Sequence, residues 1–200
     1  MSASASKVTY TYLPQALPLY AKAPGYVFME ENGVDITNTM NKEIIKVTGL
    51  DAGTYAIKMD GTVVGEFSAD DLAKGVNIAT LENNPGQIQS KGLHDNYYEK
   101  RRLAENKVRQ IFNEELRLRN VNLSAYSVHY DDPSYKEFTP QDWVNLCNKF
   151  VAEGYGTLNA DIYPGLKLNQ DELIKEVKAC IEGMERDSIP TEHKVVIEKK

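Results

Sequence analysis

The stretch "DGTVVGEFSADDLAKGVNIA", residues 60–79, contains the signals for a turn, a strand, a short helix and a helix stop, in that order. Asp60-Gly61 is the dipeptide most typical of a two-residue hairpin turn, because both residues tolerate a positive φ. Ser68, followed three residues later by Asp71, predicts the N-terminus of a helix. Gly75 predicts the end of that helix. The stretch therefore predicts a hairpin followed at once by a capped helix.

The same stretch holds a Gly-x-Asn motif, Gly75-Val76-Asn77, of the kind that some hydrolases use in an oxyanion hole. Such a hole needs hydrogen-bond donors aimed at a charge that develops beside a nucleophile. Gly75 already has a structural explanation as a helix stop. We therefore interpret the motif as scaffold rather than as part of an active site.

The flanking sequence predicts an antiparallel β-meander. In "TYAIKMD" (54–60) apolar residues occupy alternate positions, which is the period of a half-buried strand. "EIIKVTGL" (43–50) and "TVVGEF" (62–67) predict neighbouring strands, and "VTYTY" (8–12) predicts a further short one. Residues 20–42 have no firm period and predict a loop with one strand near 26–29.

Helical periodicity takes over after Asn84-Pro85. Apolar residues recur at helical offsets over about residues 86–119, where Gly92 predicts a frayed or kinked start. Pro140 begins a second amphipathic helix, and Asn169 can cap a third over 170–187. "KVVIEKK" (194–200) fits either a terminal strand or a charged tail. The predicted fold class is α+β: a small antiparallel sheet over about residues 8–80, a long helix, and two further amphipathic helices.

This reading divides the chain into three parts. Residues 1–7 are small and polar and are expected to be disordered. Residues 8–120 form a β-rich module with the long helix. Residues 121–200 form a helical extension of unknown role. A chain of 200 residues is long enough for one domain or two small ones.

The composition excludes several classes of partner. A net charge of −6 argues against a nucleic-acid partner held by a broad basic surface. No window approaches the apolar length of a membrane span, and "MSASASKVTYTY" (1–12) does not resemble a signal peptide. Cys147 and Cys180 lack metal-ligand spacing and are expected to be two buried thiols, which slightly favours a reducing cytoplasm while leaving the compartment open.

The sequence contains no complete catalytic constellation. His94, His129 and His193 are the three histidines, and each is expected to lie on the surface or in a loop. Neither a Gly-x-Ser-x-Gly elbow nor a His-Glu-x-x-His motif occurs. The adjacent carboxylates Asp70-Asp71 and Asp131-Asp132 fit capping or solvation better than a metal site. We therefore assign no catalytic, cofactor-binding or metal-binding residue, and no cofactor.

Tyrosine is unusually frequent, with twelve in 200 residues. One group lies near the start of the chain and another in a later polar segment: Tyr10, Tyr12, Tyr20 and Tyr26, then Tyr126, Tyr130 and Tyr135. Exposed aromatic residues in loops can bind sugars or proteins. Half-buried packing explains the same residues, so both interpretations stay open.

Three quoted segments carry a resemblance to a known family: "LPQALPLY", "MNKEIIKVTGLDAGTYAIKMDGTVVGEFSADDLAKGVNIATLENNPGQIQS" and "RRL". Over about residues 12–120 the chain resembles the C-terminal portion of SGNH/GDSL-type ester hydrolases, particularly the large secreted bacterial ones. In that family such a region follows the catalytic α/β domain. Residues 121–200 resemble nothing comparable.

The chain departs from the family at every catalytic block. No Gly-Asp-Ser occurs to supply the nucleophile. The residues three positions before the histidines are Lys91, Tyr126 and Pro190, so no Asp-x-x-His occurs either. The residue after Asn77 is Ile78, where the family's oxyanion block has Asp.

The resemblance implies a non-catalytic accessory module of an ester hydrolase, carbohydrate ester hydrolases included. Its implied partners are an SGNH-type catalytic domain, in cis or in trans, and a carbohydrate. The alternative is a stand-alone binding or assembly protein that uses the loop tyrosines or the long helix as its interface. An independent enzyme with an unfamiliar site is the remaining reading.

Overall fold

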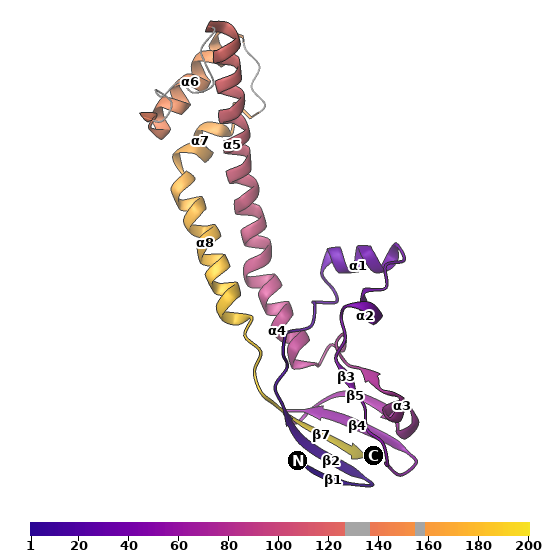
Figure 1. The fold of residues 1–200 in the computed structure, drawn as a ribbon. Helices are drawn as coiled ribbons and strands as arrows, with labels where there is room; N and C mark the ends of the chain where they lie inside the picture. Colours follow the sequence, from indigo (N-terminus) through magenta and orange to yellow (C-terminus); the bar gives the residue numbers. More distant parts are fainter. Residues whose placement is uncertain (127–136, 155–158) are drawn as a thin grey trace. The chain divides into compact units, whose positions relative to one another are not determined.

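The computed structural model describes residues 1–126, 137–154 and 159–200, with side chains left undescribed over 120–126. The predicted α+β fold class is confirmed (Figure 1). The chain forms two compact units: unit 1 comprises Met1–Asn96 and Gly183–Lys200, and unit 2 comprises Tyr97–Glu182. This division differs from the boundary expected near residue 120, because the end of the chain returns to unit 1.

Unit 1 is built on a five-stranded antiparallel sheet. Its order is β1 (Ser2–Ser4), β2 (Lys7–Tyr12), β7 (His193–Lys199), β4 (Thr54–Met59) and β5 (Thr62–Ser68). The last strand of the chain thus lies in the middle of the sheet, where Ile197 pairs with Val8 on one side and Ile57 on the other. Of the two readings of residues 194–200, the strand is the one the structure adopts.

The expected disorder of residues 1–7 was wrong. Ser2–Ser4 pair with β2 as an edge strand, with Ala3 opposite Val8. The backbone hydrogen bonds of this pairing order a segment whose small polar side chains give no sequence signal.

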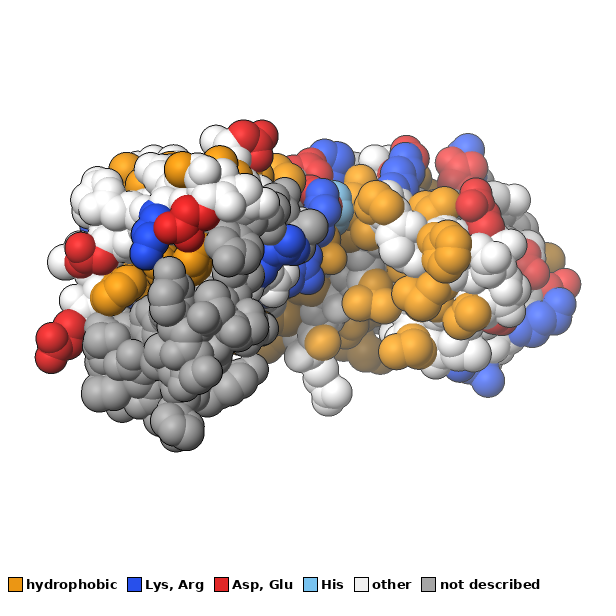
Figure 2. Space-filling view, turned by 90° about the horizontal axis from the view of Figure 1, so that it is seen from above, with side chains coloured by type: hydrophobic (Ala, Val, Ile, Leu, Met, Phe, Trp, Pro, Cys, Tyr) orange, Lys and Arg blue, Asp and Glu red, His pale blue; other side chains and the backbone are white. Residues whose placement is uncertain are grey.

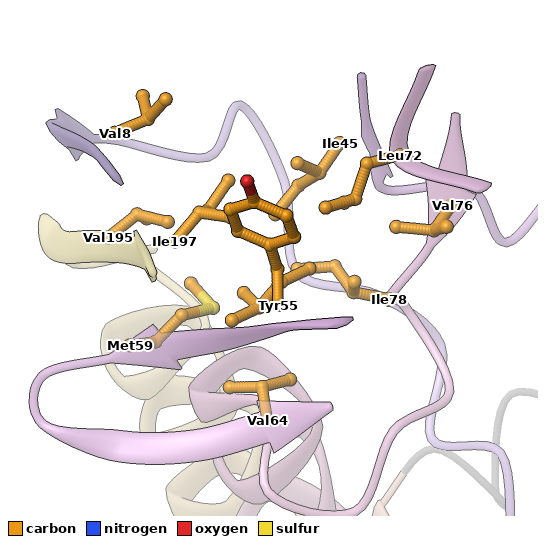
Figure 3. Close-up of a cluster of buried hydrophobic side chains, with 11 residues drawn as sticks. Val8, Ile45, Tyr55, Met59, Val64, Leu72, Val76, Ile78, Val195 and Ile197 are labelled. Atoms are coloured by element: carbon orange, nitrogen blue, oxygen red, sulfur yellow. The ribbon is translucent and has the colours of Figure 1, made fainter. Parts of the chain in front are cut away.

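A two-stranded sheet packs against the larger one and closes the core. β3 (Ile44–Ile45) pairs with β6 (Val76–Asn77), and helix α3 (Ala69–Lys74) lies between β5 and β6 in the chain. The strand expected over 43–50 is this short because β6 offers only two residues to pair with. Figure 3 shows side chains of both sheets pointing toward the ring of Tyr55. The phenol oxygen of Tyr55 lies 2.9 Å from the carbonyl oxygens of Ala5 and Asp51.

Two short helices replace the expected loop over 20–42. α1 (Pro24–Glu31) begins with Pro at its first turn, and α2 (Ile36–Thr39) is capped by the Asp35 side chain. The strand expected near 26–29 was therefore wrong. Apolar residues at consecutive positions do not distinguish a strand from a helix, and the Pro24 signal favoured the helix.

The long helix expected over 86–119 forms in three segments. They are α4 (Pro85–Leu93), a π-helical turn (His94–Tyr98) and α5 (Glu99–Tyr126). The π-helical turn begins two residues after Gly92, where the sequence predicted a kink. Units 1 and 2 divide within this turn.

Unit 2 is helical. Besides α5 it contains α6 (Pro140–Ala152), α7 (Tyr163–Leu168) and most of α8 (Gln170–Asp187). Its core gathers Ile111, Leu118, Trp143, Cys147, Phe150, Tyr163 and Leu173. Cys147 and Cys180 are free and buried, as predicted. His129, Tyr130, Asp131-Asp132 and Tyr135 lie outside the described residues, as does the side chain of Tyr126.

Candidate functional site

The Gly-x-Asn motif is part of the scaffold. The Asn77 Oδ1 accepts hydrogen bonds from the backbone N–H groups of Glu43 (3.0 Å) and Ala79 (3.1 Å). Its Nδ2 donates to the carbonyl oxygens of Thr37 and Asn41, both at 3.0 Å. All four contacts are to the chain's own backbone, which agrees with the structural interpretation of this motif.

The Asp60-Gly61 hairpin turn also forms hydrogen bonds to the start of β7. Asp60 and Gly61 both have positive φ, 50° and 86°, as a two-residue turn of this type requires. One Asp60 carboxylate oxygen accepts the backbone N–H of Lys194 at 2.8 Å, and the other lies 2.7 Å from the His193 Nδ1. The hydrogen bond from His193 is the main cause of a lowered Asp60 pKa. The turn is thereby fastened to the first residues of the central strand.

His193 is the histidine that sequence reasoning misplaced. It was expected on the surface or in a loop, but it is buried at the start of β7. An ionised carboxylate can only accept a hydrogen bond, so His193 donates to Asp60 through Nδ1. The Thr191 hydroxyl lies 3.4 Å from Nε2. Asp60, His193 and Thr191 thus follow the acid–imidazole–hydroxyl order of a nucleophilic triad. The 3.4 Å between the Thr191 hydroxyl and Nε2 is longer than the hydrogen bond that would activate the hydroxyl.

A groove runs between the inner face of β2 and the segment 43–50. One wall carries Tyr10 and Tyr12, and the other carries Glu43, Ile44 and Lys46. The cavity has a volume of about 520 Å³, within the range of about 300–1,000 Å³ that is usual for small-molecule sites. Val8, on the same face of β2, belongs to the core beneath.

Glu43 is the acidic residue that lines this groove. Its Oε2 accepts a hydrogen bond from the Asn84 side-chain amide at 2.7 Å. Burial, and then the charge of Glu43, raises the pKa of the Tyr10 phenol. The same two causes, in the same order, raise the pKa of the Tyr12 phenol. Both phenols stay protonated and can donate or accept hydrogen bonds.

A second hollow adjoins the groove and shares Tyr12 and Glu43 with it. It has a volume of about 640 Å³, and Gln15, Asn41 and Lys42 are among the residues that line it. The buried Asn41 side chain holds the backbone of Leu19 through two hydrogen bonds, of 2.9 and 3.2 Å. The two hollows therefore meet at Tyr12 and Glu43.

The outer face of α1 is apolar. We call Val27, Phe28, Met29 and Val34 the α1 face; all four side chains are exposed. Figure 2 shows hydrophobic side chains gathered over this part of unit 1. On the opposite side of the helix, Tyr26 and Glu30 lie one turn apart and both hydrogen bond to Thr37 of α2, at 2.6 Å and 2.7–2.9 Å.

Unit 2 buries charged groups in its core. Lys167 forms an ion pair with Glu115, and both side chains are largely buried. Glu114 is almost fully buried, and neither of its carboxylate oxygens has a hydrogen-bond partner. Burial, followed by the charge of Glu115, strongly raises the pKa of the neighbouring Tyr163 phenol.

The early tyrosines divide between packing and exposure. Tyr10 and Tyr12 line the groove, whereas Tyr26 is buried and Tyr20 packs its ring against that of His94. Glu43 was missed by sequence reasoning. Its role depends on Asn84, 41 positions away in the chain, which no local pattern reveals.

Within the described ranges, no three His, Cys, Asp or Glu side chains come together in a way that could hold a metal ion. The helices of those same ranges include none with the length and apolar character needed to cross a membrane.

Comparison with known proteins identifies a solved structure with a similar fold but does not identify a family. No protein-family model matches the chain, and no curated protein matches it. A solved structure, described as "BT4096 a gut microbial diltiazem-metabolizing enzyme", shares the fold with a TM-score of 0.67 and 20% sequence identity. The match covers 97% of this chain and 43% of that one. The chain therefore spans less than half the length of this structural neighbour.

Proposed function

We propose that this chain is a non-catalytic module of an SGNH/GDSL-type ester hydrolase, and that it packs against the catalytic domain through the α1 face. The exposure of three consecutive apolar residues of α1, Val27, Phe28 and Met29, is the observation that carries the proposal. Tyr26 is the buried residue of this helix, and Glu30, one turn later, also points toward the protein. Phe28 is 65% exposed on the outside.

A surface helix usually turns its apolar stripe to the core. α1 buries Tyr26 and turns Glu30 inward, but it leaves Val27, Phe28 and Met29 exposed. The hydrogen bonds of Tyr26 and Glu30 to Thr37 hold the helix in this orientation. Contiguous exposed apolar residues of this kind mark surfaces that another protein or domain covers.

The structural neighbour supports the choice of a catalytic domain as the covering partner. It is described as an enzyme, and more than half of its chain lies outside the match with this fold. We infer that the unmatched part corresponds to the domain that would cover α1. The family resemblance over about residues 12–120 supports the same assignment, since the family places its catalytic blocks in such a domain.

The Asp60–His193 pair has a structural role in this proposal. It joins the β4–β5 turn to β7, and the His193 imidazole is buried. We expect the chain alone to hydrolyse p-nitrophenyl acetate or butyrate no faster than buffer. Turnover that His193→Ala or Thr191→Val abolishes would instead identify an independent enzyme.

The docking experiment begins with the gene neighbourhood. We expect the upstream DNA, in the same reading frame or in an adjacent one, to encode Gly-Asp-Ser and then Asp-x-x-His-Pro. The catalytic domain that it encodes should bind this chain, and Phe28→Asp should weaken binding at least tenfold, because it places a charge in an apolar contact. Ile189→Asp is the matched control, since Ile189 is also 65% exposed in unit 1 but lies outside the α1 face.

The alternative function makes a different prediction for the same variants. A protein that assembles through the loop tyrosines or the long helix would form oligomers without any catalytic domain, and sedimentation experiments would show that Phe28→Asp leaves them intact. That outcome, or the absence of any catalytic reading frame, would contradict the docking proposal.

A further inference from the structure

We propose that the groove between β2 and residues 43–50 is a carbohydrate-binding site for a neutral sugar chain. Tyr10 and Tyr12 would supply the stacking surface, and Glu43 the main hydrogen-bond acceptor. This inference goes beyond the docking function and does not depend on it, because the groove and the α1 face use different residues.

The first argument is the placement of the two aromatic rings. Tyr10 and Tyr12 are two residues apart on one strand, so their side chains leave the same face of the sheet. Both are half-buried, with the core supporting them and the groove on their open side. A tyrosine combines a rigid apolar ring with a polar tip, which suits the C–H faces and hydroxyl groups of a sugar.

The second argument is the preorganisation of Glu43. The Asn84 side-chain amide holds one carboxylate oxygen through a hydrogen bond of 2.7 Å. A polar group already held in position loses little freedom when a ligand binds. Lys46, on the same wall, adds a donor. Aromatic rings beside one fixed acceptor and one donor match a polyhydroxylated ligand better than a purely apolar one.

The third argument concerns ligand length and charge. The groove and the second hollow meet at Tyr12 and Glu43, so a chain of two or more sugar units could occupy both. Glu43 is the charged residue that lines both hollows, so the carboxylate of a uronic acid bound where they meet would be repelled by it. A neutral polysaccharide should therefore bind more tightly than a polyuronate.

Affinity electrophoresis of the full chain in gels containing xylan, glucomannan or polygalacturonate tests the proposal. We expect at least one neutral polymer to retard the protein, and polygalacturonate to retard it less. Tyr12→Ala should weaken binding at least tenfold, which corresponds to about 1.4 kcal/mol. Tyr12→Phe keeps the ring and should lose less. Glu43→Gln should also weaken binding.

Tyr98→Ala is the control, because Tyr98 is an exposed tyrosine in unit 2. Circular dichroism should show that each variant keeps the parent's secondary structure. Absence of retardation by both neutral polymers would overturn the proposal. So would retardation that Tyr12→Ala and Glu43→Gln leave unchanged, or that Tyr98→Ala reduces equally. The docking proposal would survive either result, since it is measured with the Phe28 and Ile189 variants.

Discussion

At the scale of single residues, Glu198 connects three strands. It lies on the central strand β7, with one carboxylate oxygen 2.7 Å from the Lys58 ammonium of β4 and the other 2.8 Å from that of Lys7 on β2. The hydrogen bond from Lys58 is the largest cause that lowers the pKa of Glu198, from 4.5 to about 2.

Acid should therefore remove a specific part of the stability of unit 1. A carboxyl whose pKa is lower in the folded chain stabilises it fully above the unfolded pKa, and this stabilisation is lost as the pH falls through the folded pKa. Glu198→Gln should lower the Tm at pH 7, and its difference from the parent should shrink between pH 4.5 and about 2. Thermal melts followed by circular dichroism measure this difference.

The control for this titration is Glu31→Gln, which removes an exposed carboxylate from α1. Its Tm at pH 7 should equal that of the parent, because the Glu31 side chain is exposed. A Tm difference for Glu198→Gln that stays constant down to pH 2 would contradict the assignment of the two lysines as the cause.

Glu114 is a second residue whose contribution can be measured, because burying its carboxyl group without hydrogen bonds lowers the free energy of unfolding. It is 1% exposed and neither oxygen has a partner, so Glu114→Leu should stabilise unit 2 by about 1–3 kcal/mol. Trp143 is the single tryptophan and lies in the unit 2 core, so its fluorescence during urea unfolding reports this unit.

Glu115→Leu is the matched comparison on the next position of α5. It removes the partner of the buried Lys167, so it should destabilise unit 2 by about 1–3 kcal/mol. Equal effects of the two substitutions would show that Glu114 is not the uncompensated group.

At the scale of elements, β7 is the strand on which unit 1 depends. It pairs with β2 over six residue pairs and with β4 over five. Deleting residues 193–200 should abolish the cooperative unfolding of unit 1, because it splits the sheet and removes the buried Val195 and Ile197. Hydrogen exchange at the amides of β4 measures the loss of protection.

Deletion of residues 2–4 is the control for this prediction. It removes the edge strand β1, whose three residues are all exposed, and should leave the exchange of β4 slow. Similar loss of protection in both deletions would contradict the central role of β7.

These elements also show how far the sequence predicts the fold. The Asp60-Gly61 turn, the Ser68 cap and the Gly75 stop were predictable, because each signal acts within a few residues. The insertion of β7 between β2 and β4 was not, because its partners lie more than 130 positions away. α1 was missed because its apolar residues are consecutive, so the sequence showed no helical periodicity.

The candidate site was predictable only in part, for the same reason. The alternation of "VTYTY" indicated that Tyr10 and Tyr12 share a face. Glu43 and His193 gain their partners, Asn84 and Asp60, through the tertiary fold. Local patterns therefore indicated one wall of the groove and not the other.

At the scale of the whole molecule, two independent surfaces of unit 1 remain open to partners. The α1 face is apolar, and the groove combines aromatic rings with one fixed carboxylate. Unit 2 (Tyr97–Glu182) is inserted into the chain of unit 1 between Asn96 and Gly183.

Titration calorimetry of this chain against the catalytic domain that the docking proposal expects tests the central proposal most directly. The proposal predicts one-to-one binding that Phe28→Asp weakens at least tenfold and that Ile189→Asp leaves unchanged. Absence of binding, or an equal loss in both variants, would contradict docking through α1.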